Sequence, residues 1–457
     1  MKNACSKWLH SVLGLCLVLL VSSCAEDTPT EKASEDRKPY IETTHTVSIE
    51  TAEKQLTSLL KEIEGASTRS GDVSPQRKIA TRYSTKRTVG TRTSSKIIPY
   101  IHVFNFEGRK GFAIMSGDDR TVPLLALAFT GELTPRTEVD NPGLVTFLVN
   151  MEHRYAKEIE ERSKEIRNAT SSGNRIVYGP WETRFYGMNV GNCYVQWGQS
   201  SPYNIYCPQK NGEQTLTGCV ATAVAQLMST YKHPTSYGGN SFNWDTMNKH
   251  ISTTYPHSPA HEPIARLMQL LGSEGNLNTS YGTSAEGGSG ADPKNIPRTL
   301  INFGYSSGGI LIDYSTDAVV NELKKGYHLL IGGYEARQLH KKKFLGITIK
   351  KYYTYSGGHR WLAHGLLRRI RTVSQFDSSN RLVNQRKEVA WYPLCNFGWD
   401  GYGDGYYLSG AFDTNNGPAF YWNGIQTRSS SGTEAYDNEN TPNNFQYKMT
   451  AVIGIRK

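Results

Sequence analysis

The stretch TGCVATAVAQLMSTYKHP, residues 217–234, predicts a helix that begins beside a cysteine. From Val220 its apolar residues recur three or four positions apart, alanines fill the gaps, and Pro234 follows the end. Cys219 then lies in the first turn, where unpaired N–H groups and a partial positive charge lower a thiol pKa and can bind an oxyanion. Gly218 leaves room for a substrate to approach the backbone. A buried structural cysteine is the alternative that this stretch alone leaves open.

A second stretch, SGGHRWLAHG at residues 356–365, supplies a general base for such a thiol. Two glycines before His359 suit a chain that exposes an imidazole at a cleft, and the residues after it read as a strand. His364 is a rival base, ranked lower because the glycines precede His359. The glycine-rich segment 395–407 follows, and a polar or aromatic group in it is expected to hold the imidazole in its useful tautomer.

Six short motifs resemble the streptopain-like cysteine peptidases, which are relatives of papain in fold. They are WGQSSPYN at 197–204, CP at 207–208, GCVATAVAQ at 218–226, GGH at 357–359, NFGW at 396–399 and DGYY at 404–407. Upstream, GFAIMSGDDR at 111–120 resembles the propeptide of that family, which docks on the enzyme and blocks its cleft. The resemblance implies an α+β fold: a papain-like, two-lobed cysteine peptidase domain preceded by an α+β inhibitory propeptide.

The resemblance also implies roles for individual residues. Cys219 is the expected nucleophile and His359 the general base, and Gln199 is the candidate second oxyanion donor. Trp399 is expected to pack on His359, and Asn396 is a second candidate for orienting it. The residues expected to contact substrate are Ser289, Gly290 and Gly358.

The sequence departs from the family pattern at several positions. The family commonly has a small residue where Arg360 stands, an acidic residue where His364 stands, a Trp at Phe397, and a Pro at the Tyr327–His328 pair. Arg360 and His364 leave the substrate preference and the pH profile open.

The N-terminus predicts export. Lys2 and Lys7 precede an apolar run that is too short for a comfortable membrane span, and it ends in VSSC at 21–24, which resembles a lipobox. Cys24 is therefore the expected lipid anchor, and a simple secretory signal is the alternative. The expected location is the outer membrane or cell surface as a lipoprotein, or secretion, with the membrane contacted through the lipid alone.

Three regions follow along the chain: a signal peptide with lipobox at 1–24, a tether and inhibitory propeptide at 25–175, and the cysteine peptidase domain at 176–457. Within the second region we expect helices at 47–63 and 143–166, strands from residue 97 to 129, and a loop over 64–96. The polar residues 167–175 predict a flexible hinge, with processing between Asn168 and Arg175.

Composition limits the partners. The formal net charge is +10, but the basic residues are scattered and no RNA-binding signature accompanies them, which favours a solvated basic face over a nucleic-acid site. No C-x-x-C pair occurs and no His stands at metal-ligand spacing from a Cys, so we expect no structural zinc. The expected acyl-enzyme chemistry needs no metal or organic cofactor. The sequence leaves open whether Cys193, Cys207 and Cys395 form a disulfide.

Together these features predict the secreted zymogen of a cysteine endopeptidase that hydrolyses peptide bonds through a Cys-His dyad and an acyl-enzyme. Its expected partners are protein or peptide substrates and its own propeptide. Two alternatives remain: a catalytically silent surface binding or adhesion protein on the same fold, and acyl transfer to amines. The natural substrate, the subsite preference and the oligomeric state are not determined by the sequence.

Overall fold

The computed structural model describes residues 45–69, 77–91, 94–135, 139–186, 195–249, 258–344, 347–413, 420–422, 425–427 and 447–457. The predicted signal peptide, the lipobox with Cys24 and the start of the tether lie outside these residues, as does Cys193.

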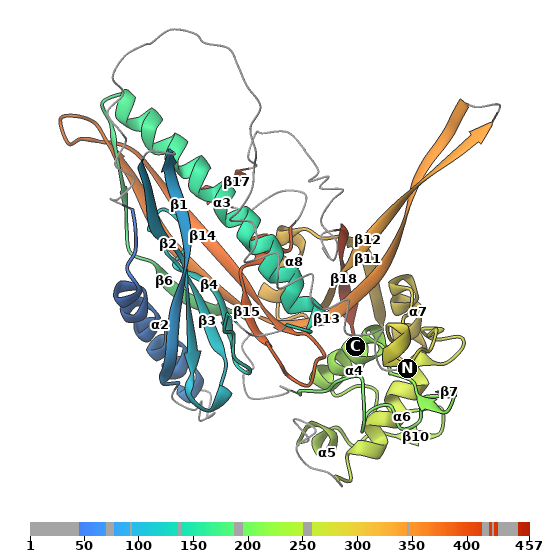
Figure 1. Ribbon diagram of the computed structural model, residues 1–457. Helices are drawn as coiled ribbons and strands as arrows, with labels where there is room; N and C mark the ends of the chain where they lie inside the picture. The colour runs from blue at the N-terminus through green and yellow to red at the C-terminus, as the bar shows by residue number, and fades with distance from the viewer. Residues whose placement is uncertain are drawn as a thin grey trace.

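The N-terminal part of the described chain forms a helix and an antiparallel meander (Figure 1). The elements are α2 (Ile49–Arg69), β1 (Ile79–Thr91), β2 (Ser94–Phe106), β3 (Phe112–Ser116) and β4 (Leu124–Ala128). Every residue of β3 and β4 is buried, as expected for their short apolar runs. The expected strands from residue 97 to 129 are confirmed.

A long helix, α3 (Pro142–Ser171), follows the meander and lies across the sheet in Figure 1. Asn141 begins it, because its side-chain oxygen accepts from the backbone N–H groups of Gly143 and Leu144. Its buried stripe includes Leu144, Phe147 and Met151, which confirms the predicted helix.

The sheet continues without a break from the meander into the C-terminal half of the chain. Its order is β1-β2-β3-β4-β15-β14-β13-β12-β18-β11, with β5 and β6 also paired to β13. The later strands are β5 (Arg175–Tyr178), β6 (Glu182–Tyr186), β11 (Ser307–Asp313), β12 (Leu329–Phe344), β13 (Ile347–Phe376), β14 (Leu382–Asn396), β15 (Gly405–Tyr407) and β18 (Tyr447–Arg456). The distal part of the β12–β13 hairpin projects from the body of the molecule (Figure 1).

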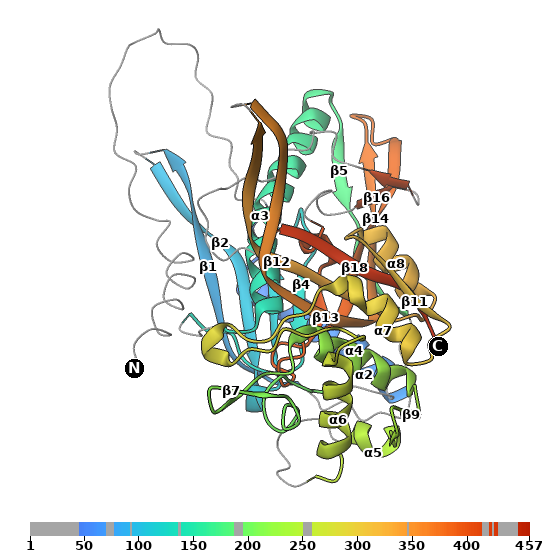
Figure 2. The same ribbon diagram turned by 90° about the vertical axis from the view of Figure 1, so that its right-hand side faces the viewer.

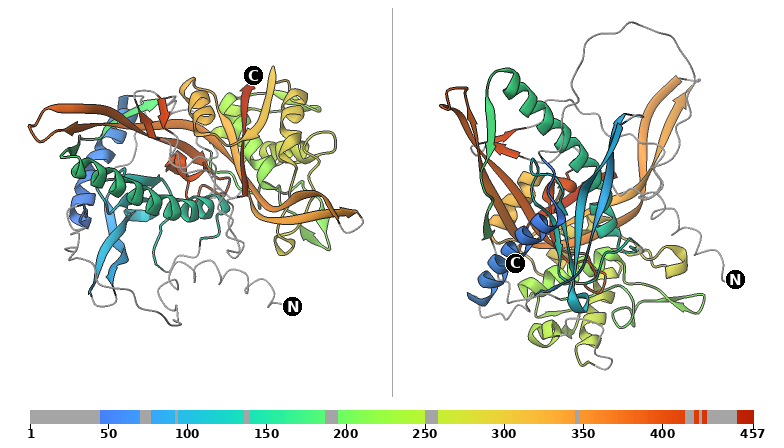
Figure 3. Two further views of the ribbon diagram at one scale, coloured as in Figure 1. Left: turned by 90° about the horizontal axis from the view of Figure 1, so that it is seen from above. Right: turned by 60° about the vertical axis from the view of Figure 1, so that its left-hand side comes forward.

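A helical lobe gathers at one end of this sheet (Figure 2). It contains α4 (Cys219–Tyr231), α5 (Trp244–Lys249), α6 (His261–Gly272) and α7 (Ile296–Asn302), while α8 (Thr316–Lys324) lies between β11 and β12 in the chain. Two short pairs of strands accompany these helices: β7 (Gln209–Lys210) with β8 (Glu213–Gln214), and β9 (Ser236–Tyr237) with β10 (Asn240–Ser241). A third pair, β16 (Phe420–Trp422) with β17 (Ile425–Thr427), lies away from this lobe and contacts β14. Figure 3 shows the helical lobe and the sheet from two further directions. The expected two-lobed α+β arrangement is confirmed.

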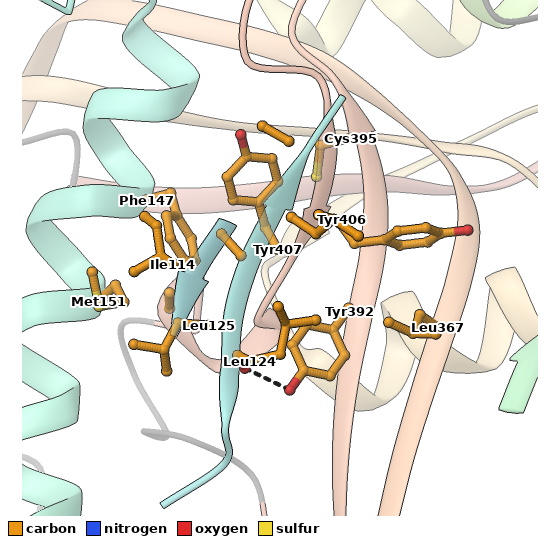
Figure 4. Close-up of a cluster of buried hydrophobic side chains, with 14 of the residues drawn as sticks. Ile114, Leu124, Leu125, Phe147, Met151, Leu367, Tyr392, Cys395, Tyr406 and Tyr407 are labelled. Carbon is orange, nitrogen blue, oxygen red and sulfur yellow. Dashed lines mark hydrogen bonds between the residues drawn. The ribbon is translucent and has the colours of Figure 1, made fainter. Parts of the chain in front are cut away.

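The predicted propeptide and the predicted peptidase domain share one hydrophobic core (Figure 4). Strand β4 pairs with β15 in antiparallel register, with Leu127 opposite Tyr406. Around this seam, side chains of β3, β4 and α3 pack on those of β13, β14 and β15, and the Tyr392 hydroxyl donates to the Leu124 carbonyl at 2.7 Å. The upstream segment therefore extends the sheet of the downstream domain.

Two expectations about the upstream segment are wrong. The predicted loop over 64–96 holds the end of α2 and most of the β1–β2 hairpin, because Thr, Val, Ile and Tyr in that stretch fit a strand in spite of the many charges. The predicted hinge at 167–175 is helical as far as Ser171, where hydroxyl groups bond back to carbonyls four residues earlier. Gly173, at a φ of 72°, then turns the chain into β5.

Candidate active site

Cys219 is the first residue of α4, one position earlier than the predicted start. Gly218 precedes it at a φ of 86°, a conformation that favours glycine. A Cβ atom at Gly218 would lie 3.0 Å from the Ser289 carbonyl oxygen. Gly218 therefore allows both the turn into the helix and the close approach of the Ser289 loop.

The Cys219 thiol is buried against β13. The side chain is 8% exposed, and its Sγ donates to the Gly358 carbonyl at 3.8 Å. Burial raises the pKa of this thiol above its ordinary value, and the Arg360 backbone N–H, the Arg360 charge and the helix N–H groups act against that rise. The expected lowering of the thiol pKa is wrong for this structure, because the loss of solvent outweighs the helix N-terminus.

His359 lies on β13 and is 4% exposed, so the expected exposure at a cleft is also wrong. Its Nε2 donates to the Phe397 carbonyl at 2.9 Å. The Trp399 ring meets the imidazole edge-on, with centroids 5.9 Å apart. Burial lowers the pKa of His359 to about 4, and the positive charge of Arg360 adds to this effect. The imidazole is therefore neutral at pH 7.

The thiol and the imidazole lie on opposite sides of β13. Side chains alternate along a strand, so His359 shares its face with Trp361, and Arg360 shares the other with Leu362. Trp361 packs in the core of the large sheet, whereas Leu362 packs in the core that contains Cys219 and α4. Among the described residues, no hydrogen bond joins the Cys219 thiol to the His359 ring.

Asn396 does not contact the imidazole in this structure. Its amide donates to the Val195 carbonyl at 2.5 Å, and its side-chain oxygen accepts from the Gly398 N–H at 3.1 Å. The atom that holds His359 is instead the backbone carbonyl of Phe397. Sequence analysis missed it because a carbonyl carries no side-chain signal. The orienting role of Asn396 stays a prediction for the processed enzyme.

Gln199 lies beside the N-terminus of α4. Its carbonyl accepts from the Thr217 N–H at 3.0 Å, and the neighbouring Trp197 carbonyl accepts from the Gln226 amide at 3.1 Å. These bonds hold the Gln199 segment against the nucleophile helix. The use of its side-chain amide as an oxyanion donor stays a prediction.

Two of the predicted substrate residues lie in a loop next to Gly218. The Ser289 hydroxyl donates to the Leu216 carbonyl at 2.7 Å and also accepts from the Gly282 N–H, while Gly290 pairs with Ser280. The third, Gly358, lies opposite Tyr334 on β12 and presents its carbonyl to the Cys219 thiol. All three thus lie near Cys219, and their contacts with substrate stay predictions.

His364 lies far from the thiol. Its ring meets that of His328 with centroids 6.2 Å apart, and His328 Nδ1 lies 2.6 Å from the hydroxyl of Thr230. Thr230 is at the opposite end of α4 from Cys219, a separation of roughly 17 Å. The structure therefore places His364 away from the candidate site.

The family profile described as "Peptidase C10 family" matches residues 197–407, the region that contains Gln199, Cys219, His359 and Trp399. Residues 197–407 are therefore similar to the peptidase C10 family. A second profile, described as "Spi protease inhibitor", matches residues 44–155, which are α2, the meander and the first half of α3.

Relatives include a thiol protease/hemagglutinin PrtT of Porphyromonas gingivalis, 29% identical over 34% of this chain and 18% of its own length. Streptopain of Streptococcus pyogenes is 29% identical over 29% of this chain and 33% of its own length. The matched part of the chain thus spans between about a fifth and a third of the length of these curated relatives. A prointerpain A fragment of Prevotella intermedia is similar in structure, at 20% identity and a TM-score of 0.47, over 82% of this chain and 99% of that one.

The segment that the Spi inhibitor profile matches holds the loop at residues 397–404. The Asn141 amide donates to the Tyr402 carbonyl at 2.6 Å, and the Phe129 N–H donates to the Asp404 carbonyl at 2.7 Å. Asp404 in turn accepts from the Phe397 N–H at 2.8 Å. The upstream segment therefore positions the very carbonyl that holds His359.

Cys207, Cys219 and Cys395 are free thiols in the structure. In the part of the chain that the structure describes, no group of three or more His, Cys, Asp or Glu side chains is arranged to hold a metal ion. No helix in those same ranges is both long and apolar enough to cross a membrane.

Proposed function

We propose that this chain is the zymogen of a cysteine endopeptidase, with Cys219 as nucleophile and His359 as general base. The observation that carries the proposal is a thiol at the first turn of a buried helix, against the strand that bears His359, within a C10 peptidase region. The helix N-terminus provides backbone donors for the oxyanion, and the Gln199 segment lies beside it.

The chemistry requires the imidazole and the thiol to meet on one side of β13. His359 then takes the thiol proton, and the thiolate sulfur bonds to the scissile carbonyl carbon to give an oxyanion. Collapse of this tetrahedral intermediate breaks the C–N bond, and the imidazolium gives its proton to the leaving amine. Water, deprotonated by His359, hydrolyses the thioester and regenerates the thiol.

The upstream segment, residues 25–175 in our proposal, acts as the intramolecular inhibitor. Its strand β4 extends the peptidase sheet, and its contacts with the 397–404 loop keep the Phe397 carbonyl against His359. Release of this segment frees the loop and the imidazole together. The exposed turn at residues 171–173 is a fitting place for cleavage.

The experiment is peptide hydrolysis by the processed enzyme and by Cys219→Ala, with Cys207→Ala as a control that removes another free thiol. We expect Cys219→Ala to lose all measurable hydrolysis and all labelling by a thiol-directed epoxide, and Cys207→Ala to keep both. Undiminished hydrolysis by Cys219→Ala would refute the assignment. Mass analysis of products formed with an added amine separates hydrolysis from acyl transfer.

We also propose export with lipid attachment at Cys24, on the strength of the VSSC motif after an apolar run. Expression with a radiolabelled fatty acid should label the wild-type chain and leave Cys24→Ala unlabelled. Equal labelling of the two chains would contradict the anchor.

A further inference from the structure

Arg360, the residue after His359, is buried on the α4 side of β13. Its side chain is 3% exposed, and Nη2 donates to the Thr450 hydroxyl at 2.8 Å. A Cβ atom at Gly332 would lie 2.9 Å from the Arg360 Cζ. The guanidinium therefore lies over Gly332 of β12 and reaches Thr450 of β18, in space that a side chain at position 332 would fill.

Most of the hydrogen-bonding capacity of this guanidinium is unused. Within the described ranges, Nε and Nη1 of Arg360 have no hydrogen-bond partner, and no carboxylate forms an ion pair with it. Arg371, on the same strand, is also buried but bonds to Glu388 at 2.8 Å. A buried cation without an ionic partner is unfavourable, and a carboxylate brought by a substrate would offset that cost.

The residue that carries these unused donors lies next to the nucleophile in its backbone. The thiol of Cys219 lies against the backbone of residues 358–360, and the thiol and the guanidinium shift the pKa of one another. Tyr334 and Asp292 are the other groups whose charge affects the pKa of Arg360. Asp292 is exposed, and its Oδ1 accepts from the Lys294 N–H at 3.0 Å, so it does not neutralise the guanidinium by direct contact.

We propose that Arg360 determines specificity in the processed enzyme by binding the carboxylate of an acidic substrate side chain near the scissile bond. This inference rests on the proposed function and assigns one subsite of it. A carboxylate accepts several N–H bonds at once and neutralises the charge, which a neutral side chain cannot do. The short path from Cys219 to Arg360 limits the acidic side chain to the residues flanking the cleaved bond.

The test uses paired peptides that differ only in Glu or Gln at each of the three positions on either side of the cleaved bond. The processed wild-type enzyme should cleave one Glu peptide with a kcat/KM at least about tenfold above its Gln partner. Arg360→Met, which keeps the volume and removes the charge, should bring this ratio to within about twofold while the Gln peptide is still cleaved. Arg360→Lys should keep part of the preference.

Arg369→Met is the matched control, because Arg369 is buried on the same strand about 30 Å further along. It should leave the Glu/Gln ratio unchanged, and melting curves show which variants are folded.

Cleavage of both peptides at equal rates by the wild type would overturn the inference and leave the peptidase assignment intact. An equal fall in the cleavage rate of both peptides in folded Arg360→Met would also overturn the inference. It would mean that Arg360 acts on the reactivity of Cys219 and not on substrate choice. A wild-type enzyme that cleaves no peptide and has an unreactive Cys219 would refute the proposed function itself.

Discussion

At the scale of single residues, the main question is which histidine is the general base for the Cys219 thiol. His359 is held by the Phe397 carbonyl and lies one strand face away from the thiol, whereas His364 lies near the far end of α4. Both are buried, so a comparison of the two separates a catalytic role from a general effect of losing a buried imidazole.

We therefore predict that His359→Ala lowers kcat of the processed enzyme by about 10²–10⁴-fold, because no other described base is near the thiol. His364→Ala should leave kcat within a few-fold once folding is confirmed by circular dichroism. Steady-state hydrolysis across pH 5–9 measures both. A larger loss in His364→Ala than in His359→Ala would reverse the assignment.

At the scale of elements, a buried ionic cluster joins α3 to β13 and β14. Glu388, fully buried on β14, bonds to Arg162 of α3 at 2.7 Å, to Arg371 at 2.8 Å and to Arg386 at 3.0 Å. Arg162 also pairs with Glu165 at 2.9 Å. Since α3 belongs to the upstream segment, the cluster ties the inhibitor to the peptidase domain.

Arg162→Met should destabilise the precursor by about 2–4 kcal/mol, because it leaves buried carboxylates with fewer partners. Lys164→Met is the control, since Lys164 makes an exposed pair with Glu160 that is worth little. Denaturant unfolding of the two precursors measures the difference. An Arg162→Met precursor as stable as Lys164→Met would show that the cluster does not hold α3 in place.

Individual elements also show what the sequence could and could not predict. Helix α4 and the short strands β3 and β4 were predictable because local periodicity and burial agree in them. Strand β1 was not, because its charged residues hide a strand that is fixed by pairing with β2. The two candidate catalytic residues were found from motifs, but their separation across β13 was not, since it depends on contacts between segments more than 100 residues apart in the chain, such as Asn141 with Tyr402.

At the scale of the whole molecule, buried histidines make the stability of the precursor depend on pH. Burial lowers the pKa of His359 and His328 to about 4 and that of His364 to about 3. Their unfolded values are near 6.5, so the unfolded chain binds more protons below that pH, and stability falls as pH drops from 6.5 toward 4. Glu158 acts in the opposite direction, because burial raises its pKa to about 8.

On going from pH 7 to pH 5, each histidine lowers the free energy of unfolding by about 2 kcal/mol. The three histidines together outweigh the opposite contribution of Glu158. The precursor should therefore have a lower Tm at pH 5 than at pH 7, with a smaller difference in His364→Phe. Calorimetry at the two pH values checks this. A higher Tm at pH 5 would mean that Glu158 and the other carboxylates dominate the pH dependence.

The central claim is that Cys219 is a nucleophile that the upstream segment keeps from its base. The most direct test is the rate at which a thiol-directed epoxide labels the chain before and after removal of that segment, followed by peptide mass analysis to locate the adduct. The account predicts a single adduct on Cys219 that forms at least about 100-fold faster in the processed enzyme than in the precursor. Equal rates in the two forms, or an adduct on Cys207 or Cys395 in place of Cys219, would contradict it.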